Sequence, residues 1–305
     1  MLKINAPESN SQKRLNNEHE IASEPYSLEE NAGPPPLPSN LSKDERYFLL
    51  IQTALRKCLE YKPKFGKGRK EGFSLEQFTA LYSADPFYHW FGIDSPLMYA
   101  AHKAAGGMTS IYRQIGIGGQ WVFYQILQDH LGLNREQAIW SYKIEGTQGK
   151  QRTLTLDGRI ALGDVKSADA RARIRNWLSE VASQIRLPDD TLENIKGIVF
   201  ETRQGYKSKD SKRQNADIAN ASKAYANLYV PVLLLFSTQI DGDVAQRYRE
   251  NFWVLLTGTL SGAATASAYS FCREIVGYDL ADFFTRHSPN IKGEVENVLK
   301  TLLST

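Results

Sequence analysis

Two uninterrupted apolar stretches, IKGIVFE at residues 195–201 and VPVLLLFSTQI at residues 230–240, constrain the fold of this chain more than any other feature. A strand can be apolar at every position only when both of its faces are covered, which is typical of strands inside α/β proteins. The polar segment between the two stretches is long enough for the helical crossover that parallel strands require. The sequence therefore predicts a strand, helix, strand unit over residues 195–240.

Further segments predict an antiparallel hairpin and amphipathic helices around this unit. Residues 139–165 have the period of strands, with Gly146 and Gly149 between AIWSYKIEG and RTLTLDGRIAL. A helix is predicted from Lys43 behind an N-cap at Ser42, and another over residues 168–186. The fold class expected from these elements is α/β, with a mixed central sheet flanked by helices, an N-terminal helical region and a C-terminal helical region.

Several less regular segments receive structural interpretations. Gly116, Gly118 and Gly119 complete neither a dinucleotide fingerprint nor a P-loop, so they are interpreted as a turn that precedes an amphipathic helix. Residues 252–272 are uncharged but too polar for a membrane span, so they are interpreted as buried helix and turn within a helical C-terminal part. All five tryptophans are interpreted as packing groups, at Trp90, Trp121, Trp140, Trp177 and Trp253.

Composition divides the chain into three parts and indicates its compartment. Residues 1–42 are polar and proline-rich and predict a flexible tail, residues 43–110 a helical region, and residues 111–305 an α/β core with C-terminal helices. The helical region contains a basic loop, which is either a solvated linker or an arm that touches phosphates, with Lys62, Lys64, Lys67, Arg69 and Lys70. Two distant cysteines without a pairing motif and the lack of a secretory signal or membrane span predict a cytoplasmic protein with no membrane partner.

The chemistry is expected at Glu201, which stands at the end of the first apolar strand. A carboxylate at a buried strand end is costly unless it is paired or binds a metal, so Glu201 either forms an ion pair with Arg203 or ligates an ion. The polar groups after it, and cations in the first turns of the following helix, suggest an anionic partner. Contacts to such a partner are therefore predicted for Arg203, Gln204, Lys209, Lys212, Arg213 and Gln214. The core-facing stripe of the same helix is predicted at Ile218, Ala221, Tyr225 and Leu228.

A second carboxylate, Asp157, belongs to an Asp-Gly pair in the predicted hairpin. It is either a plain hairpin corner or a group that the hairpin brings beside Glu201. In the second case two carboxylates form a hard oxygen site that suits Mg²⁺. A nearby lysine would then orient or deprotonate the attacking water.

These residues resemble the core of the PD-(D/E)XK nucleases, particularly type II restriction endonucleases. Asp157, the strand with Glu201, and the stretch ETRQGYKSKDSKRQNADI carry the resemblance, which covers roughly residues 110–240. It implies a restriction-endonuclease-like core in which Asp157 and Glu201 are catalytic and bind Mg²⁺. It also implies double-stranded DNA as the substrate and a homodimer.

The sequence departs from that motif at two positions. Leu156 stands where proline is frequent, and Arg203 stands where the motif has lysine, so the catalytic lysine is assigned to Lys207, with Lys209 as the next choice. A rival placement assigns the second acid to Asp164 and the lysine to Lys166, because these two residues fit the pattern of an acid and a lysine separated by one residue.

The function expected is that of a Mg²⁺-dependent endonuclease that cuts double-stranded DNA at a short specific site. The alternative is a non-enzymatic DNA- or RNA-binding protein in which Asp157 and Glu201 are structural. A small-molecule enzyme of α/β type is a third possibility, and it predicts binding that hardly depends on salt.

Overall fold

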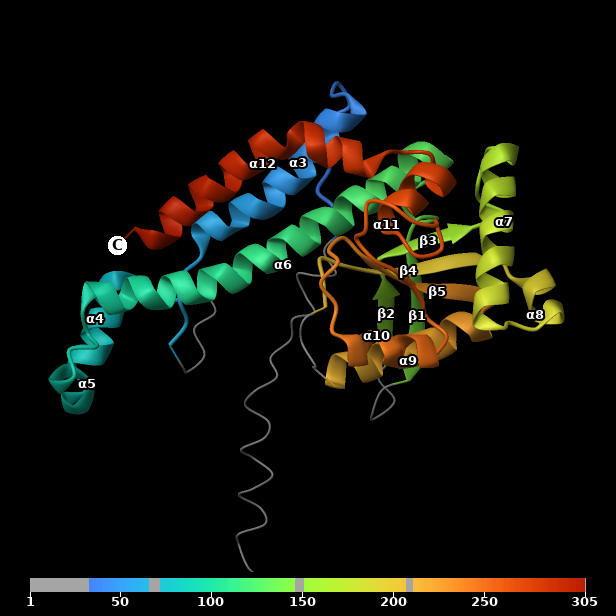
Figure 1. The fold of residues 1–305 in the computed structure, drawn as a ribbon. Helices are drawn as coiled ribbons and strands as arrows, with labels where there is room; N and C mark the ends of the chain where they lie inside the picture. Colours follow the sequence, from blue (N-terminus) through green and yellow to red (C-terminus); the bar gives the residue numbers. More distant parts are fainter. Residues whose placement is uncertain (1–32, 66–71, 146–150, 207–210, 305) are drawn as a thin grey trace, which may run out of the picture. The chain divides into compact units, whose positions relative to one another are not determined.

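A mixed sheet of four strands, flanked by helices, forms the centre of the fold (Figure 1). The computed structural model describes residues 33–65, 72–145, 151–206 and 211–304, and all of the elements named here belong to one compact unit, Pro35–Thr305. The sheet has the order β3-β4-β5-β6, in which β3 is antiparallel to β4, and β4, β5 and β6 are parallel. A separate antiparallel pair is formed by β1 and β2. The strands are β1 (Trp140–Glu145), β2 (Gln151–Leu156), β3 (Gly158–Ala161), β4 (Gly197–Arg203), β5 (Tyr229–Leu235) and β6 (Val254–Leu256).

The helices cover both faces of this sheet and also extend beyond it (Figure 1). No described helix is long and apolar enough to cross a membrane. In chain order the helices are α3 (Lys43–Arg56), η1 (Lys57–Glu60), α4 (Leu75–Ser83), α5 (Pro86–Trp90), α6 (Pro96–Leu131), α7 (Ala168–Ile185), α8 (Asp189–Asn194), α9 (Ser211–Ala226), α10 (Gly242–Glu250), α11 (Ala268–Ser270), η3 (Phe271–Val276) and α12 (Leu280–Leu303).

The predicted strand, helix, strand unit is confirmed as β4, α9 and β5. The two strands are parallel, with Phe200 opposite Val232. Their residues alternate between the large buried cluster and smaller ones, as the period of two along a strand requires. Phe200 and Leu234 join the large cluster that includes α6, whereas Leu233 and Leu235 join the cluster that includes α10. Both faces of the sheet are therefore covered, which explains the continuous apolar runs.

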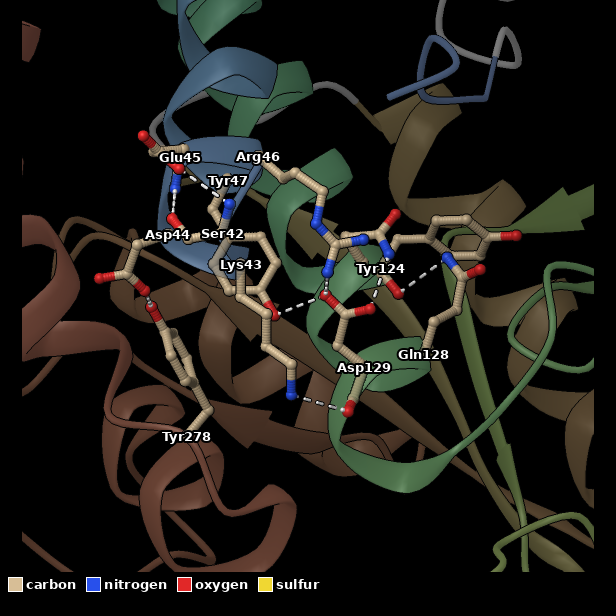
Figure 2. A network of polar contacts seen from close by, with 11 residues as sticks. Ser42, Lys43, Asp44, Glu45, Arg46, Tyr47, Tyr124, Gln128, Asp129 and Tyr278 are labelled. Carbon is tan, nitrogen blue, oxygen red and sulfur yellow. Dashed lines mark hydrogen bonds and ion pairs between the residues drawn. The ribbon is translucent and has the colours of Figure 1, made fainter. Parts of the chain in front are cut away.

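The predicted helix behind Ser42 is α3, and Ser42 forms a capping box with Glu45. This helix packs against α6 through polar as well as apolar contacts (Figure 2). The Asp129 carboxylate of α6 accepts hydrogen bonds from Arg46 at 3.0 Å and from the Tyr47 hydroxyl at 2.9 Å. Lys43 adds a bond to the Asp129 carbonyl oxygen at 3.2 Å. These bonds satisfy a carboxylate near the end of α6 and fix the start of α3 against it.

Other predictions agree with the structure in part. The hairpin of residues 139–165 is present as β1 and β2, whose connection at residues 146–150 lies outside the described residues. The helix predicted over residues 168–186 is α7. Of the predicted flexible tail, residues 1–32 lie outside the described residues, whereas Leu37 packs against the main core. Residues 66–71 of the predicted basic loop also lie outside them.

Two interpretations are wrong. Gly116, Gly118 and Gly119 do not form a turn, because they lie inside α6, which runs unbroken from Pro96 to Leu131 and so crosses the expected boundary at residue 110. The C-terminal part is not wholly helical, because Val254–Leu256 forms the edge strand β6. Three residues are too few to show a strand period, and the neighbouring Gly, Ser and Thr residues suggested a turn.

Candidate functional site

Two of the predicted acidic residues, Asp157 and Glu201, lie at one end of the β3–β4 strand pair. β4 ends at Arg203, opposite the end of β5 at Leu235, and in open α/β sheets such carboxyl ends are where ligands bind. β3 begins at Gly158, which pairs with Phe200 in antiparallel register. Asp157, just before Gly158, and Glu201, just after Phe200, therefore stand at the same end of the β3–β4 pair. Their carboxylates have different partners, because Asp157 accepts from Gln120 of α6 whereas Glu201 pairs with Arg203, which also binds Asp217 of α9.

Asp157 is held by groups from two elements. Its Oδ2 atom accepts a hydrogen bond from the backbone amide of Thr202 in β4 at 2.7 Å. Its Oδ1 atom accepts a second from the Gln120 side chain of α6. The Asp-Gly pair is not a hairpin corner, because it forms a bend between β2, which pairs with β1, and β3, which pairs with β4. Sequence reasoning missed Gln120, since nothing in the pattern of α6 indicates which polar residue faces the sheet.

Glu201 forms the ion pair that was one of the two expected alternatives. Arg203, two residues later on the same face of β4, donates to Glu201 Oε1 at 3.0 Å. Arg203 also donates to the buried Asp217 of α9 at 2.5 Å, and its guanidinium lies 4.6 Å from the centre of the Tyr206 ring. Burial by itself lowers the pKa of this guanidinium, but the Glu201 and Asp217 carboxylates outweigh that effect and raise it. Arg203 is thus a permanent cation between two carboxylates.

Residues of α10 complete this polar cluster. The Tyr248 hydroxyl donates to Asp217 and lies 3.2 Å from the Tyr206 hydroxyl. Burial, and then the Asp217 carboxylate, raise the pKa of Tyr248, so it remains a neutral donor. Arg247 donates to Gln214 at 2.9 Å. Together these bonds tie α10 and α9 to the end of β4.

The prediction of which α9 residues face the core is wrong, because the buried face of the helix is rotated from the expected one. Ala221 is buried as expected, but Ile218 and Tyr225 are only partly buried, and Leu228 lies beyond the end of the helix. The side chains buried along α9 are Gln214, Asp217, Ala221 and Ala224. Two of these are polar because Arg247 and Arg203 supply partners for them, and such partners cannot be recognised from the helix sequence alone.

The residues predicted to contact DNA fall into three groups. Arg203 and Gln214 are buried, where they contact other protein groups, and Gln204 is partly buried at the end of β4. Lys209 lies outside the described residues, as does Lys207, the predicted catalytic lysine. Lys212 and Arg213 lie in the first turn of α9, with side chains outside the described part of the structure.

The rival acid, Asp164, lies at the opposite end of β3. β3 spans Gly158–Ala161, about 13 Å of extended chain, so Asp157 precedes the strand and Asp164 follows it. Asp164 accepts hydrogen bonds from Gln137 at 3.2 Å and from Arg159 at 3.4 Å. The register therefore favours Glu201 over Asp164 as the partner of Asp157.

Known proteins offer no guide to this site. No family model, curated protein or solved structure matches the chain. In the described part of the chain, no three or more His, Cys, Asp or Glu side chains form a group that could hold a metal ion. The donor set of the candidate site is instead two carboxylates, Asp157 and Glu201. That set suits Mg²⁺, which usually keeps several waters and takes only one or two carboxylates from a protein.

Proposed function

We propose that this chain is a Mg²⁺-dependent endonuclease that hydrolyses phosphodiester bonds of double-stranded DNA at a short specific site. The observation that supports the proposal is the register of β3 and β4, in which Gly158 pairs with Phe200, so that Asp157 and Glu201 are the next residues at the same end of the strand pair. Arg203 follows Glu201 on the same face of β4. The site therefore has a first acid, Asp157, and then an acid and a cation separated by one residue, Glu201 and Arg203. The order of α6, the hairpin, β4, α9 and β5 is compatible with a restriction-endonuclease-like core.

In this proposal Asp157 and Glu201 would hold the ion. When bound, Mg²⁺ polarises the phosphoryl oxygen and lowers the pKa of a bound water. Gln120 and the Thr202 amide orient Asp157, and Arg203 orients Glu201. Lys207, shortly after β4, is proposed to orient or deprotonate the attacking water, with Lys209 as the alternative.

DNA binding is assigned to the start of α9 and the segment before it. The cations assigned to DNA binding in this segment are Lys209, Lys212 and Arg213. Neutralising phosphates with such side chains provides affinity without sequence specificity. Since Arg203 and Gln214 are buried, their part in the proposal is to fix β4, α9 and α10 relative to one another. As in other enzymes that act on short symmetric sites, the working form is proposed to be a homodimer.

One observation favours a second candidate function, a DNA- or RNA-binding protein without catalysis. Glu201 is already paired with Arg203 inside the protein, as a purely structural carboxylate would be. In that case Asp157 would serve only to bind the backbone amide of Thr202, which lies in β4 beyond the start of β3.

Cleavage of plasmid DNA by the purified chain, with Mg²⁺ or with a chelator, separates the two functions. Asp157→Asn and Glu201→Gln are expected to abolish cutting while DNA binding is retained or strengthened, because each removes a negative charge beside the phosphates. Glu180→Gln, an exposed glutamate on α7, is the matched control and should cut normally.

Asp164→Asn tests the rival placement and is expected to retain activity. DNA binding without Mg²⁺-dependent cutting by the wild type would support the second function. Equal cutting by the wild type, Asp157→Asn and Glu201→Gln would exclude this site.

A further inference from the structure

Large apolar side chains gather on the surface of α4, α5 and the start of α6. Six of them, within residues 81–97, define what we call the aromatic patch. Isolated exposed apolar residues are ordinary, but a contiguous group of this kind marks an interaction surface. The patch consists of Leu81 (46% exposed), Phe87 (59%), Tyr88 (39%), Trp90 (78%), Phe91 (70%) and Leu97 (78%). Trp90 therefore contradicts the interpretation of all five tryptophans as packing groups, whereas the other four are buried.

The patch rests on helices with capped starts, of which α4 is anchored by one buried side chain. Phe78 of α4 is fully buried and its ring lies 4.3 Å from that of Tyr82. Ser74 forms a capping box at the start of α4, and Asp85 caps α5 through the amide of Phe87 at 2.9 Å. The exposure of the aromatic patch is thus a property of a structured surface. A surface ordered in advance loses little conformational entropy when it binds a partner.

Charge excludes an anionic partner for this surface. No lysine or arginine occurs within residues 72–102, so nucleic acid and anionic lipid would find no cation there. The carboxylates of α4, α5 and the turn after α5 are used locally. Asp94 binds His89 at 2.7 Å and Ser83 at 2.6 Å, and Asp85 caps α5. The patch itself therefore carries little uncompensated charge.

We propose that the aromatic patch is a self-association surface that joins two copies of this chain. A two-fold contact places a patch against an identical patch. Such a patch should be apolar, because any charge at its centre would face the same charge in the second copy and repel it. At about 200 Å² for a fully exposed side chain of this size, the six residues offer roughly 700 Å² of accessible surface. A stable interface of standard size buries about 800 Å² of each partner. The inference rests on α4 and α5 and is independent of the proposed nuclease activity.

Trp90 is a built-in reporter for this contact, since the other four tryptophans are at most 6% exposed. Acrylamide quenching of tryptophan fluorescence should therefore report mainly on Trp90. We expect the quenchable fraction to fall as the full-length chain is concentrated through the low micromolar range. Sedimentation velocity over the same range should show conversion of monomer to dimer.

Trp90→Ser and Phe91→Ser are expected to raise the dimer dissociation constant about 30-fold or more, which is the loss typical of an interface hot spot. Leu260→Ser is the matched control, because Leu260 is also 68% exposed but lies outside the patch, and it should dimerise like the wild type. Unchanged circular dichroism and melting temperature would show that each variant folds. A wild type that stays monomeric at about 100 μM, a concentration at which even weak interfaces of this size form, would overturn the proposal. Equal dimerisation of the wild type and both patch variants would overturn it as well.

Discussion

Arg203 is charged inside the protein because its surroundings supply opposite charge from two elements. Glu201 belongs to the same strand and Asp217 to the next helix, and both lie within 3.0 Å of the guanidinium. Burying such a group is tolerated only if the partners are well placed, since the cost of desolvating ions is several kcal/mol each. The group therefore matters less for net stability than for fixing α9 to β4.

Replacing Arg203 with methionine should be strongly destabilising. Glu201 and Asp217 would be left as buried carboxylates without a cation, and breaking a buried pair in this way lowers the free energy of unfolding by about 3–5 kcal/mol. Urea denaturation at pH 7 measures this change. Arg175→Met, at an exposed position of α7, is the control and should change stability by no more than about 0.5 kcal/mol. A loss below about 1 kcal/mol for Arg203→Met would show that water already reaches the network.

His130, near the end of α6, is a second group whose protonation state depends on burial. Its ring lies 4.8 Å from that of Tyr278, and its Nε2 atom has no hydrogen-bond partner among the described residues. Burial lowers the pKa of His130, and Lys43 lowers it further, although Asp129 and Asp44 oppose the shift. In Figure 2, Lys43 reaches the carbonyl oxygen of Asp129 at the end of α6, whereas Asp44 points to Tyr278.

The lowered pKa of His130 predicts a loss of stability in mild acid. The unfolded chain has an imidazole pKa of about 6.5 and takes up its proton first, so the stabilisation is complete above that pH and is lost as the pH falls through the folded pKa. The loss is about 1.4 kcal/mol for each unit by which folding lowers the pKa. The test compares the free energies of unfolding of the wild type and His130→Phe between pH 7.5 and pH 5. An equal pH dependence in the two proteins would refute this role for His130.

At the scale of the element, α6 is a helix that uses glycines for close packing. A Cβ atom added at Gly107 would lie 2.6 Å from the fully buried Leu302 of α12. A Cβ atom at Gly116 would lie 3.6 Å from Gln204, which is an ordinary contact. The two glycines therefore occur in the same helix for different reasons, and only Gly107 is required by its neighbour.

This difference predicts that alanine substitutions at Gly116 and Gly107 change the free energy of unfolding in opposite directions. Gly116→Ala should raise the free energy of unfolding by about 0.5–1 kcal/mol, since glycine is a poor helix former. Gly107→Ala gains the same amount from helix propensity but overpacks the contact with Leu302 at a cost of about 1–3 kcal/mol, so a net loss is expected. Thermal or urea denaturation of the two variants provides the comparison. If both substitutions stabilised the protein equally, the close approach of α6 and α12 would be incorrect.

The elements that were predictable from sequence are those whose signal is local. Ser42 with Glu45 indicates the start of α3, and the apolar runs indicate β4 and β5, because capping and burial on both faces leave a direct mark on composition. α6 was not predicted as one helix, because its glycines have the composition of a turn. Two of them, Gly118 and Gly119, lie close to distant residues of α3 and of the segment after β5. β6 was missed since it has only three residues.

The candidate site was predictable to a similar degree. Asp157 and Glu201 were expected together because the hairpin would bring Asp157 beside the strand of Glu201. The register of β3 and β4 puts both residues at one end of the strand pair, and the shared metal site stays a prediction. Asp217 and Gln120 were not identified, because each becomes significant only through a partner on another element. No physical signal in the sequence distinguishes a helix aspartate that meets a buried arginine from one that faces water.

At the scale of the whole unit, α6 connects the two proposed working surfaces. Its 36 residues correspond to about 54 Å of helix. Leu97, in its first turn, belongs to the aromatic patch, and Gln120, in its last third, holds Asp157. α3 and α12 pack along the same helix (Figure 1). In a dimer formed through the aromatic patch, one continuous helix would therefore connect the interface to the proposed catalytic site at Asp157 in each copy.

If both proposals hold, dimerisation should determine whether one or two DNA strands are cut. A monomer carries one Asp157–Glu201 pair, whereas a two-fold dimer carries two, one for each antiparallel strand of the duplex. On supercoiled plasmid the wild type and Leu260→Ser are expected to yield linear DNA. Trp90→Ser, at concentrations where it sediments as a monomer, should instead accumulate nicked circles, with the second cut slowed by about 10²-fold, because that cut is no longer intramolecular. Gel analysis of single-turnover reactions follows both products. Linear DNA formed at the wild-type rate by monomeric Trp90→Ser would show that the aromatic patch does not couple the two cuts, even if the chain is a nuclease.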